Sequence, residues 1–325
     1  MFQDKPLVTI AMMTFNQEKY VRDSVRGILA QTYDPVEIII SDDCSTDRTW
    51  QILALEIDLY RRNGGIHSKI YVHRNDVNLG VAKNFEGIIS HAHGEIIICQ
   101  AGDDISLPNR AEVIVESYLK NPAATVFCHE ATCIDQDNKE RTRSNMRTSA
   151  FMPLGALMAY SRKVFTEFGP VEESDAWEDD IYARRAQMLG DEIQIPQPLL
   201  KYRVGCSGIS SGSDDKKVRR TRVSRGCLAA ARQSRRDLEF IKDKLSNTQY
   251  EVIKKLIDKH EQFYQNEYNM YNAATWIGRF KAFNRIYLGV NPCLYIYKFI
   301  NTVAPRWCAI LFLPATKLAQ FVFRR

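Results

Sequence analysis

The sequence predicts an α/β protein with a mostly parallel central sheet, followed by a helical C-terminal extension. Two observations lead to this class. Short apolar runs alternate with amphipathic segments over the first two-thirds of the chain, which is the rhythm of βαβ units. Beyond a Gly- and Ser-rich stretch at residues 205–212 the apolar residues recur at helical spacing. We therefore expect a body of residues 1–215 and a tail of residues 216–325.

The first half of the body yields seven expected elements, each bounded by a change of periodicity or by turn residues. They are the strand Leu7–Met12, the helix Tyr20–Gln31, the strand Val36–Ile40, the helix Asp47–Arg62, the strand Lys69–His73, the helix Val81–His91 and the strand Glu95–Cys99.

The second half continues the alternation. Pro108 fits the first turn of a helix, and Asn121-Pro122 ends it. The elements expected after it are the strand Thr125–Ile134, a polar mobile loop at 135–149, an apolar segment Leu154–Tyr160, the helix Arg162–Phe168, a helix beginning at Glu178 and the strand Ile195–Val204. In the tail, Thr248 and Glu251 match a capping box at the start of an amphipathic helix.

The two parts differ in charge. Residues 1–215 hold 22 Lys and Arg against 32 Asp and Glu, or −10, whereas residues 216–325 hold 22 against 7, or +15. A basic tail indicates an anionic partner. The run Lys216–Arg225 lacks the aromatic residues that nucleic-acid binding favours, so we expect no nucleic acid. Aromatic and basic residues alternate from Trp276 to Arg325, which favours an anionic membrane surface; packing of these aromatics in a small helical core is the alternative.

The expected location is cytoplasmic. Eight scattered cysteines without a CxxC pair predict reduced thiols. The first fifteen residues lack the basic start of a signal peptide. The longest charge-free stretch of the tail, Ile286–Tyr297, is about half of the roughly 20 residues that a membrane-spanning helix needs. We expect peripheral attachment to the cytoplasmic face of the inner membrane.

Two acidic pairs follow expected strands. In an open parallel sheet, ligands bind beyond the carboxyl ends of the strands, so Asp42 and Asp43 are candidates for reading a bound nucleotide. Asp103 and Asp104 follow the next central strand, and two hard carboxylates suit Mg²⁺ or Mn²⁺. The alternative for each pair is capping of the helix that follows it.

A third acidic cluster, Glu178 to Asp180, opens a helix. A carboxylate here is a candidate general base, which needs an acceptor hydroxyl within hydrogen-bond reach. The alternative is favourable interaction of the acids with the helix dipole. The residues alone leave both readings open.

Five motifs stand in order along the chain. They are TFN at 14–16, DDCSTD at 42–47, NLG at 78–80, DDISLP at 103–108 and ED at 178–179. Together they resemble the family 2 glycosyltransferases, over about residues 5 to 212. The resemblance implies a GT-A type, Rossmann-like α/β/α sandwich. It also implies that residues 1–215 are the catalytic domain.

The resemblance assigns a role to each candidate residue. It implies that the donor nucleotide is bound by Thr14, Asn16, Asp42, Asp43, Asn78, Gly80 and Asn84, with Asp42 reading the base and Asp43 more structural. It implies that Asp103, with Asp104 beside it, holds the metal and that Asp179, with Glu178 nearby, is the catalytic base.

The sequence departs from the family pattern at two positions. Ala101 stands where the first acid of the family's DxD signature is expected, which puts ribose recognition in doubt. Gly205 replaces the His of a YRxH motif, so Arg203 becomes the candidate for neutralising diphosphate. An impaired glycan-binding or scaffold protein of the same assembly machinery is therefore the alternative function.

The expected function is that of an inverting, metal-dependent glycosyltransferase. The expected donor is a nucleotide-sugar, first of all a UDP-sugar, and the expected acceptor is a lipid-linked glycan in O-antigen or other cell-surface polysaccharide assembly. A dehydrogenase is excluded because no GxGxxG follows a strand. A sugar-nucleotide pyrophosphorylase is excluded because the segment after the first strand, TFNQEKY, has no Gly.

Overall fold

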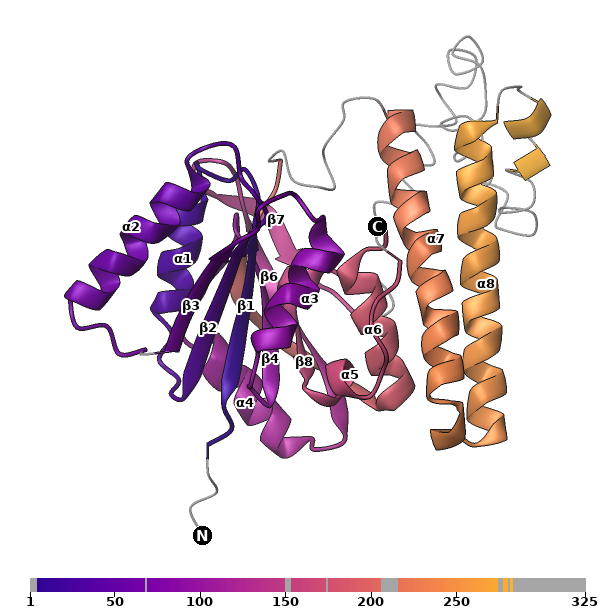
Figure 1. Cartoon of the computed structure of the whole chain (residues 1–325), viewed down its shortest axis with the longest axis horizontal. Coiled ribbons are helices and arrows are strands. Elements are labelled where there is room, and N and C mark those ends of the chain that lie inside the picture. The colour runs from indigo at the N-terminus through magenta and orange to yellow at the C-terminus, as the bar shows by residue number, and fades with distance from the viewer. Residues whose placement is uncertain are drawn as a thin grey trace. The chain divides into compact units, whose positions relative to one another are not determined.

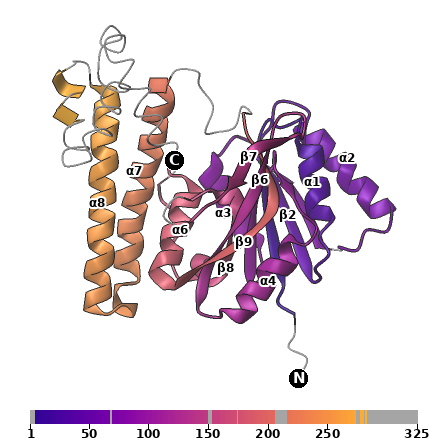
Figure 2. The same ribbon diagram turned by 180° about the vertical axis from the view of Figure 1, so that it is seen from behind.

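The computed structural model describes residues 5–67, 69–149, 153–173, 175–205, 216–273, 277–279 and 281–282. Over these residues the chain forms one nine-stranded mixed sheet with helices on both faces, as Figures 1 and 2 show. The strand order is β3-β2-β1-β4-β8-β6-β9-β5, and β7 pairs with β6. The α/β class is confirmed.

The elements agree closely with the expected alternation. The strands are β1 Val8–Thr14, β2 Val36–Asp42, β3 Lys69–Arg74, β4 Ile96–Ala101, β5 Ile105–Ser106, β6 Ala124–Ile134, β7 Glu140–Met146, β8 Met158–Ser161 and β9 Asp191–Arg203. The helices are α1 Val21–Leu29, α2 Thr49–Arg62, α3 Val81–His91, α4 Arg110–Lys120, η1 Gly155–Leu157, α5 Lys163–Thr166, α6 Glu178–Leu189, α7 Lys216–Phe240, η3 Lys242–Lys244 and α8 Asn247–Asn272.

The first half of the sheet is parallel. Strand β1 pairs in parallel with β2 and with β4, and β2 pairs in parallel with β3. Each of these crossovers contains a helix, as parallel connections require. Strand β8 then runs antiparallel to β4 and to β6. The loops that follow β1, β2 and β4 consequently share one edge of the sheet, where ligands of open α/β sheets bind.

The central strands are buried on both faces, so successive residues join different cores. Ile10, Ile38 and Ile98 pack under helices α1, α2 and α4. Their neighbours Ala11 and Ile39 pack under α3, α5 and α6. The sheet is thus the middle layer of an α/β/α sandwich, as expected.

One element differs from the expectation. The polar loop expected at residues 135–149 contains the strand β7, which pairs antiparallel with β6. The segment Glu140–Met146 has no apolar alternation, and its extended conformation comes from hydrogen bonding to β6. The turn at Asp135–Lys139 is irregular and is closed by a hydrogen bond from the Asp135 N–H to the Lys139 carbonyl, and residues 147–149 also lie outside the strand.

The tail forms helices, as expected. The capping box is not the expected Thr248–Glu251 pair: the Gln249 N–H donates to the Ser246 hydroxyl oxygen, and the Ser246 N–H donates to Gln249 Oε1. In the part of the tail that the structure describes, as elsewhere along the described chain, no helix combines the length and hydropathy needed to cross a bilayer. Most of the aromatic segment after residue 276 lies outside the described residues.

Contacts along the chain define two compact units. One unit comprises Met1–Gly208 and Ala229–Lys254, and the other comprises Ile209–Leu228 and Lys255–Arg325. The first unit includes the C-terminal half of α7, whose residues Ala229 and Ala230 belong to the core beneath α6. The domain boundary expected at residue 215 stays a prediction.

Candidate functional site

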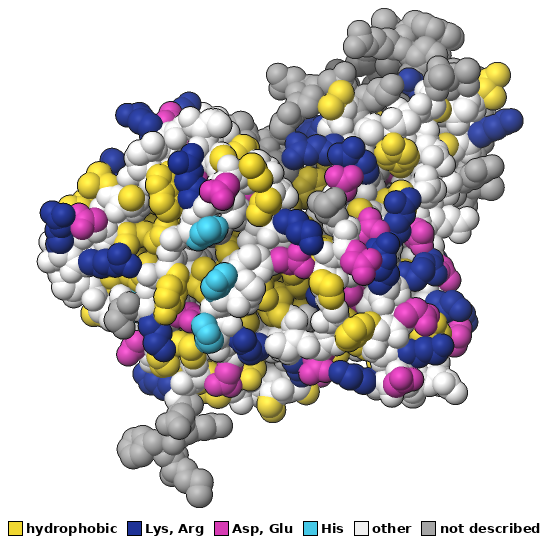
Figure 3. All heavy atoms as spheres, viewed as in Figure 1, with side chains coloured by type: hydrophobic (Ala, Val, Ile, Leu, Met, Phe, Trp, Pro, Cys, Tyr) yellow, Lys and Arg dark blue, Asp and Glu magenta, His cyan; other side chains and the backbone are white. Residues whose placement is uncertain are grey.

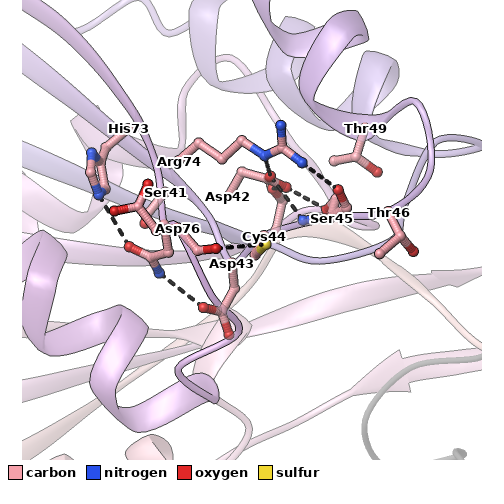
Figure 4. Close-up of polar contacts among 12 residues, drawn as sticks. Ser41, Asp42, Asp43, Cys44, Ser45, Thr46, Thr49, His73, Arg74 and Asp76 are labelled. Carbon is pink, nitrogen blue, oxygen red and sulfur yellow. Dashed lines mark hydrogen bonds and ion pairs between the residues drawn. The ribbon is translucent and has the colours of Figure 1, made fainter.

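The loops after β1 and β2 are joined through Asp42. Its buried carboxylate accepts hydrogen bonds from the Thr14 hydroxyl at 3.2 Å, the Ser45 N–H at 3.1 Å and the Ser45 hydroxyl. The Arg74 guanidinium forms an ion pair with it, with 3.4 Å between Nε and Oδ2 (Figure 4). Asp42 is therefore a junction between loops, and its predicted contact with a base stays a prediction.

Asp43 holds the loop that follows β3. Its carboxylate accepts from the Leu79 N–H at 2.8 Å, the Gly80 N–H at 2.9 Å and the Asn75 amide at 2.9 Å. Because the carboxylate is 4% exposed, these bonds form largely away from water. The structural role expected for Asp43 agrees with these contacts. At the start of α2, the carboxylate that accepts from the Thr49 N–H belongs to Asp47.

The other candidate donor residues lie around this junction. Asn16 has a positive φ of 51°, and its side chain accepts from the Thr46 N–H at 2.8 Å. The Asn78 amide donates to the Asp43 carbonyl, while Gly80 has a φ of 79°, a conformation that favours glycine. Asn84 is buried and accepts from the Ser41 hydroxyl at 2.5 Å. The structure thus brings the predicted donor loops together at one edge.

Asp103 and Asp104 lie in the turn between β4 and β5. Asp103 is half-buried, whereas Asp104 is fully buried and accepts from the Arg203 N–H at 2.7 Å instead of capping α4. Burial raises the pKa of both carboxyls, and the negative charge of Asp103 raises that of Asp104 further. A nearby cation would relieve this repulsion.

Glycine at position 102 sets this turn against the loop after β1. A Cβ built there would lie 2.2 Å from Gln17 Oε1 and 2.8 Å from Thr14 Cγ2, so a larger residue would have to displace these side chains. The acidic turn and the Thr14 loop are therefore in contact. Sequence reasoning missed Gly102, although it directly precedes the acidic pair.

The Arg203 guanidinium forms its hydrogen bonds within the protein. Its guanidinium donates to the Asp103 carbonyl at 2.9 Å, the Asp135 carbonyl at 2.8 Å and Asn138 Oδ1 at 2.6 Å. It also lies over the Tyr20 ring, 4.5 Å from the centroid. With 4% of its surface exposed, Arg203 ties the β6–β7 turn to the acidic turn, and its predicted contact with diphosphate stays a prediction.

Glu178 and Asp179 begin helix α6. The Gly155 N–H in η1 donates to Asp179 Oδ2 at 3.3 Å, and the Asp180 N–H donates to Oδ1 at 2.9 Å. Burial raises the pKa of Glu178 to about 7. The pKa of Asp179 is raised well above its ordinary value by burial and then by the charges of Glu178 and Asp180. A carboxyl that titrates near neutrality, as Glu178 does, suits proton transfer.

Tyr202 of β9 lies within electrostatic reach of both acidic groups. Burial raises the pKa of its hydroxyl, and the negative charges of Asp104, Asp103 and Asp179 raise it further. The acidic turn and the start of α6 are more than seventy residues apart in the sequence, yet both act electrostatically on this one phenol. This arrangement places the candidate metal acids near the candidate base.

Two arginines of α6 are paired with carboxylates. Arg184 Nη2 donates to Asp180 Oδ1 at 3.3 Å, one turn back along the helix. Arg185 forms a bidentate pair with Asp237 of α7, at 2.8 and 2.9 Å. Arg185 therefore joins the C-terminal half of α7 to the helix that begins with the candidate base.

A family model described as "Glycosyl transferase family 2" matches residues 9–177, just over half of the chain. The match includes the acidic turn and the loops after β1, β2 and β3. It ends immediately before Glu178.

A curated relative is a protein of uncharacterized function from Mycobacterium tuberculosis. It is 29% identical over 230 residues, which are 66% of this chain and 64% of the relative. The chain thus spans somewhat less than two-thirds of the length of the first curated relatives that it matches.

Two solved structures resemble the fold. Residues 1–349 of TarS from S. aureus, in complex with UDP-GlcNAc, align with a TM-score of 0.56 and 14% identity over 98% of this chain and 91% of that chain. The mannosyltransferase PcManGT from Pyrobaculum calidifontis, in complex with GDP-Man and Mn²⁺, aligns with a TM-score of 0.59 and 14% identity over 98% and 85%. The expected GT-A type fold is confirmed, and the match of the family model shows that the chain belongs to glycosyltransferase family 2.

Proposed function

We propose that the chain is an inverting, divalent-metal-dependent glycosyltransferase. It transfers a sugar from a nucleotide-sugar donor to a hydroxyl of a glycan acceptor. The observation that carries the proposal is the position of the acidic turn: Asp103 and Asp104 follow β4, and Gly102 sets their turn against Thr14 in the loop after β1. This is the place where a parallel sheet binds nucleotides.

The acidic turn fits a divalent cation. No group of three or more His, Cys, Asp and Glu side chains within the described ranges is arranged to hold a metal ion. A complete protein cage is not required, because Mg²⁺ and similar ions are commonly held by one or two carboxylates together with substrate phosphates. Asp103 is the accessible carboxylate and Asp104 the buried one behind it. When bound, the cation would act as a Lewis acid that stabilises the leaving diphosphate.

Asp179 is the proposed base. It accepts the proton of the acceptor hydroxyl while the acceptor oxygen forms a bond to the anomeric carbon and the bond to the diphosphate breaks. One base and in-line attack invert the anomeric configuration. Burial raises the pKa of both Glu178 and Asp179, so the pair keeps protons to higher pH than ordinary carboxyls, and Asp179 acts as the base in its ionised form.

The proposed donor is a UDP-sugar, with a GDP-sugar as the next choice. TarS was solved with UDP-GlcNAc and PcManGT with GDP-Man and Mn²⁺, which supports a nucleotide-sugar and a metal for this fold. A panel of nucleotide-sugars with Mn²⁺ tests this by thermal denaturation. A ligand at a hundredfold excess over its Kd should raise the Tm by about 5 to 10 °C. If the whole panel has no effect, the donor proposal is wrong.

We further propose that the acceptor is a lipid-linked glycan of O-antigen or related cell-surface polysaccharide assembly. The chain would then work at the cytoplasmic face of the inner membrane. The net charge of +15 over residues 216–325 supports attraction to anionic lipid. On α8, exposed Leu256 and Phe263 stand among lysines, in the pattern of an interfacial helix.

Sedimentation with vesicles tests the membrane proposal. The full chain should sediment with vesicles that contain phosphatidylglycerol, and high salt should release it. The control is a chain ending at Asn272, which keeps α7 and α8 but lacks the aromatic segment. Equal binding to neutral and anionic vesicles would contradict the proposal. A chain cut at residue 215 is unsuitable, because it loses the buried Arg185–Asp237 pair.

A further inference from the structure

Arg110, the first residue of α4, is the largest fully buried side chain of the described chain. All five of its N–H donors are used. Nε donates to His129 Nε2 at 3.0 Å, Nη1 donates to Gln100 Oε1 at 2.9 Å and to Ser106 Oγ at 3.0 Å, and Nη2 donates to the Cys99 carbonyl at 2.9 Å and the Ala156 carbonyl at 2.7 Å. The planar fork is thus fully satisfied.

One set of these bonds leads to the acidic turn. Gln100 accepts from Arg110 and donates its own amide to the Asp104 carbonyl at 2.8 Å and the Ala101 carbonyl at 2.8 Å. Ser106 donates to the same Gln100 oxygen at 2.7 Å. Through Gln100 and Ser106, Arg110 fixes both ends of the turn that holds the two candidate metal acids.

The bond to the Ala156 carbonyl leads to the candidate base. Nη2 holds the Ala156 carbonyl in η1, and the preceding residue, Gly155, donates its N–H to Asp179. The element η1 is a single 3-10 turn of three residues, so a displacement at Ala156 reaches Gly155 directly. One guanidinium therefore connects the acidic turn with the start of α6.

A buried cation without a hydrogen-bonded carboxylate is costly to keep. The five acceptors of Arg110 are carbonyl, amide, hydroxyl and imidazole groups, and burial lowers the pKa of the guanidinium to about 10. Burial and the nearby Arg110 charge also keep the pKa of His129 well below its ordinary value, so the imidazole is neutral and acts as the acceptor. An apolar side chain in its place would leave these five acceptors without their donor, so this one guanidinium holds the network together.

We propose that Arg110 is a positioning residue that holds the acidic turn and, through η1, the carboxylate of Asp179 in one shared geometry. This inference rests on the proposed function, because it assigns Asp179 the role of base. Arg110 itself does not contact substrate. Its effect passes through the Ala156 carbonyl and the Gly155 N–H.

It follows that the pKa of Asp179 depends on Arg110. Five titratable groups interact electrostatically with Asp179. They are Glu178 and Asp180 on α6, Cys99 on β4, Tyr160 on β8 and Tyr202 on β9. Among these, Cys99 feels the charge of Arg110, and Arg110→Lys keeps that charge. The Gly155 N–H stabilises the ionised form of Asp179, so releasing η1 should raise the pKa of Asp179 by about one unit.

The test measures that pKa directly in the full chain. Aspartate is labelled with ¹³C at Cγ, the Asp179 signal is assigned by its absence in Asp179→Asn, and the carboxyl is titrated by NMR. Arg110→Lys keeps the positive charge but lacks the fork, and it should raise the pKa by about one unit. The acidic limb of kcat should move to higher pH by the same amount.

Arg162→Lys is the matched control. Arg162 donates to the Ala92 and Gly94 carbonyls near the amino end of β4, away from the acidic turn, so its replacement should leave the pKa of Asp179 unchanged. An unchanged pKa in Arg110→Lys, or an equal rise in Arg162→Lys, would overturn the inference. The titration needs no donor, so a chain that transfers no sugar would contradict the proposed function and leave this result standing.

If Arg110→Lys does not fold, the wild-type protein still decides the question. The guanidinium ¹⁵N signals of Arg110 should change at the pKa of Asp179, and that step should vanish in Asp179→Asn. Guanidinium signals of Arg110 that show no change at the pKa of Asp179 would overturn the inference.

Discussion

The buried ion pair between Arg185 of α6 and Asp237 of α7 allows a quantitative prediction. Arg185 and Asp237 are each 2% exposed, and the Arg185 guanidinium also donates to the Gly169 carbonyl at 2.9 Å. Asp237→Ala would leave this cation buried without its carboxylate, which costs about 3 to 5 kcal/mol. For a domain of this size each kcal/mol lowers the Tm by about 2 to 4 °C, so we expect a fall of about 6 to 20 °C.

The control lies one residue earlier in the chain. Arg236 pairs with Glu173 and Glu172 at the surface, with its side chain 47% exposed, so Arg236→Ala should cost less than about 1 kcal/mol. Scanning calorimetry or urea unfolding of both variants makes the comparison. The double variant Arg185→Met with Asp237→Leu should recover most of the loss, since it leaves no unpaired charge. Equal small losses in Asp237→Ala and Arg236→Ala would refute the view that α7 is part of the catalytic fold.

Three further predictions concern the acidic groups. Asp179→Asn should lower kcat by about 10² to 10⁴ while calorimetry shows unchanged donor affinity; an unchanged rate would remove Asp179 from the role of base. Between pH 4.5, the ordinary pKa of a glutamate, and about 7, folded Glu178 keeps a proton that the unfolded chain releases, so stability should fall as pH rises through this window. In Glu178→Gln the decline of Tm over that range should be shallower, and an identical pH profile would contradict the raised pKa. Asp103→Ala should weaken Mn²⁺ binding in the presence of UDP at least tenfold, whereas equal affinity would place the metal elsewhere.

The elements of the sheet could be predicted because their causes are local. Alternating apolar runs and helical periodicity appear in the residues themselves, and so does the edge at which Asp42 and Asp103 emerge. Strand β7 was missed because its charged residues become extended only through pairing with β6. The capping box was placed at Thr248 instead of Ser246, since both positions show the same pattern.

The roles of individual side chains were harder to predict. The contacts of Arg110 with Ala156 and of Arg185 with Asp237 join residues 46 and 52 positions apart, and no local pattern marks them. Arg203 stood in a recognisable motif, yet its partners lie in the β6–β7 turn, which was expected to be a loop. Motifs identified the acidic groups, whereas the connections between them depend on the fold.

Sugar transfer itself tests the central proposal most directly. Radiolabelled UDP-GlcNAc and GDP-mannose are incubated with Mn²⁺ and a lipid extract of bacterial membranes, and label in the organic phase is counted for the wild type and Asp179→Asn. We predict metal-dependent incorporation from at least one donor by the wild type, and its loss in Asp179→Asn although that variant still binds the donor. Incorporation that is equal in both proteins, or donor binding without any transfer to glycan acceptors, would contradict the account and favour a glycan-binding or scaffold protein.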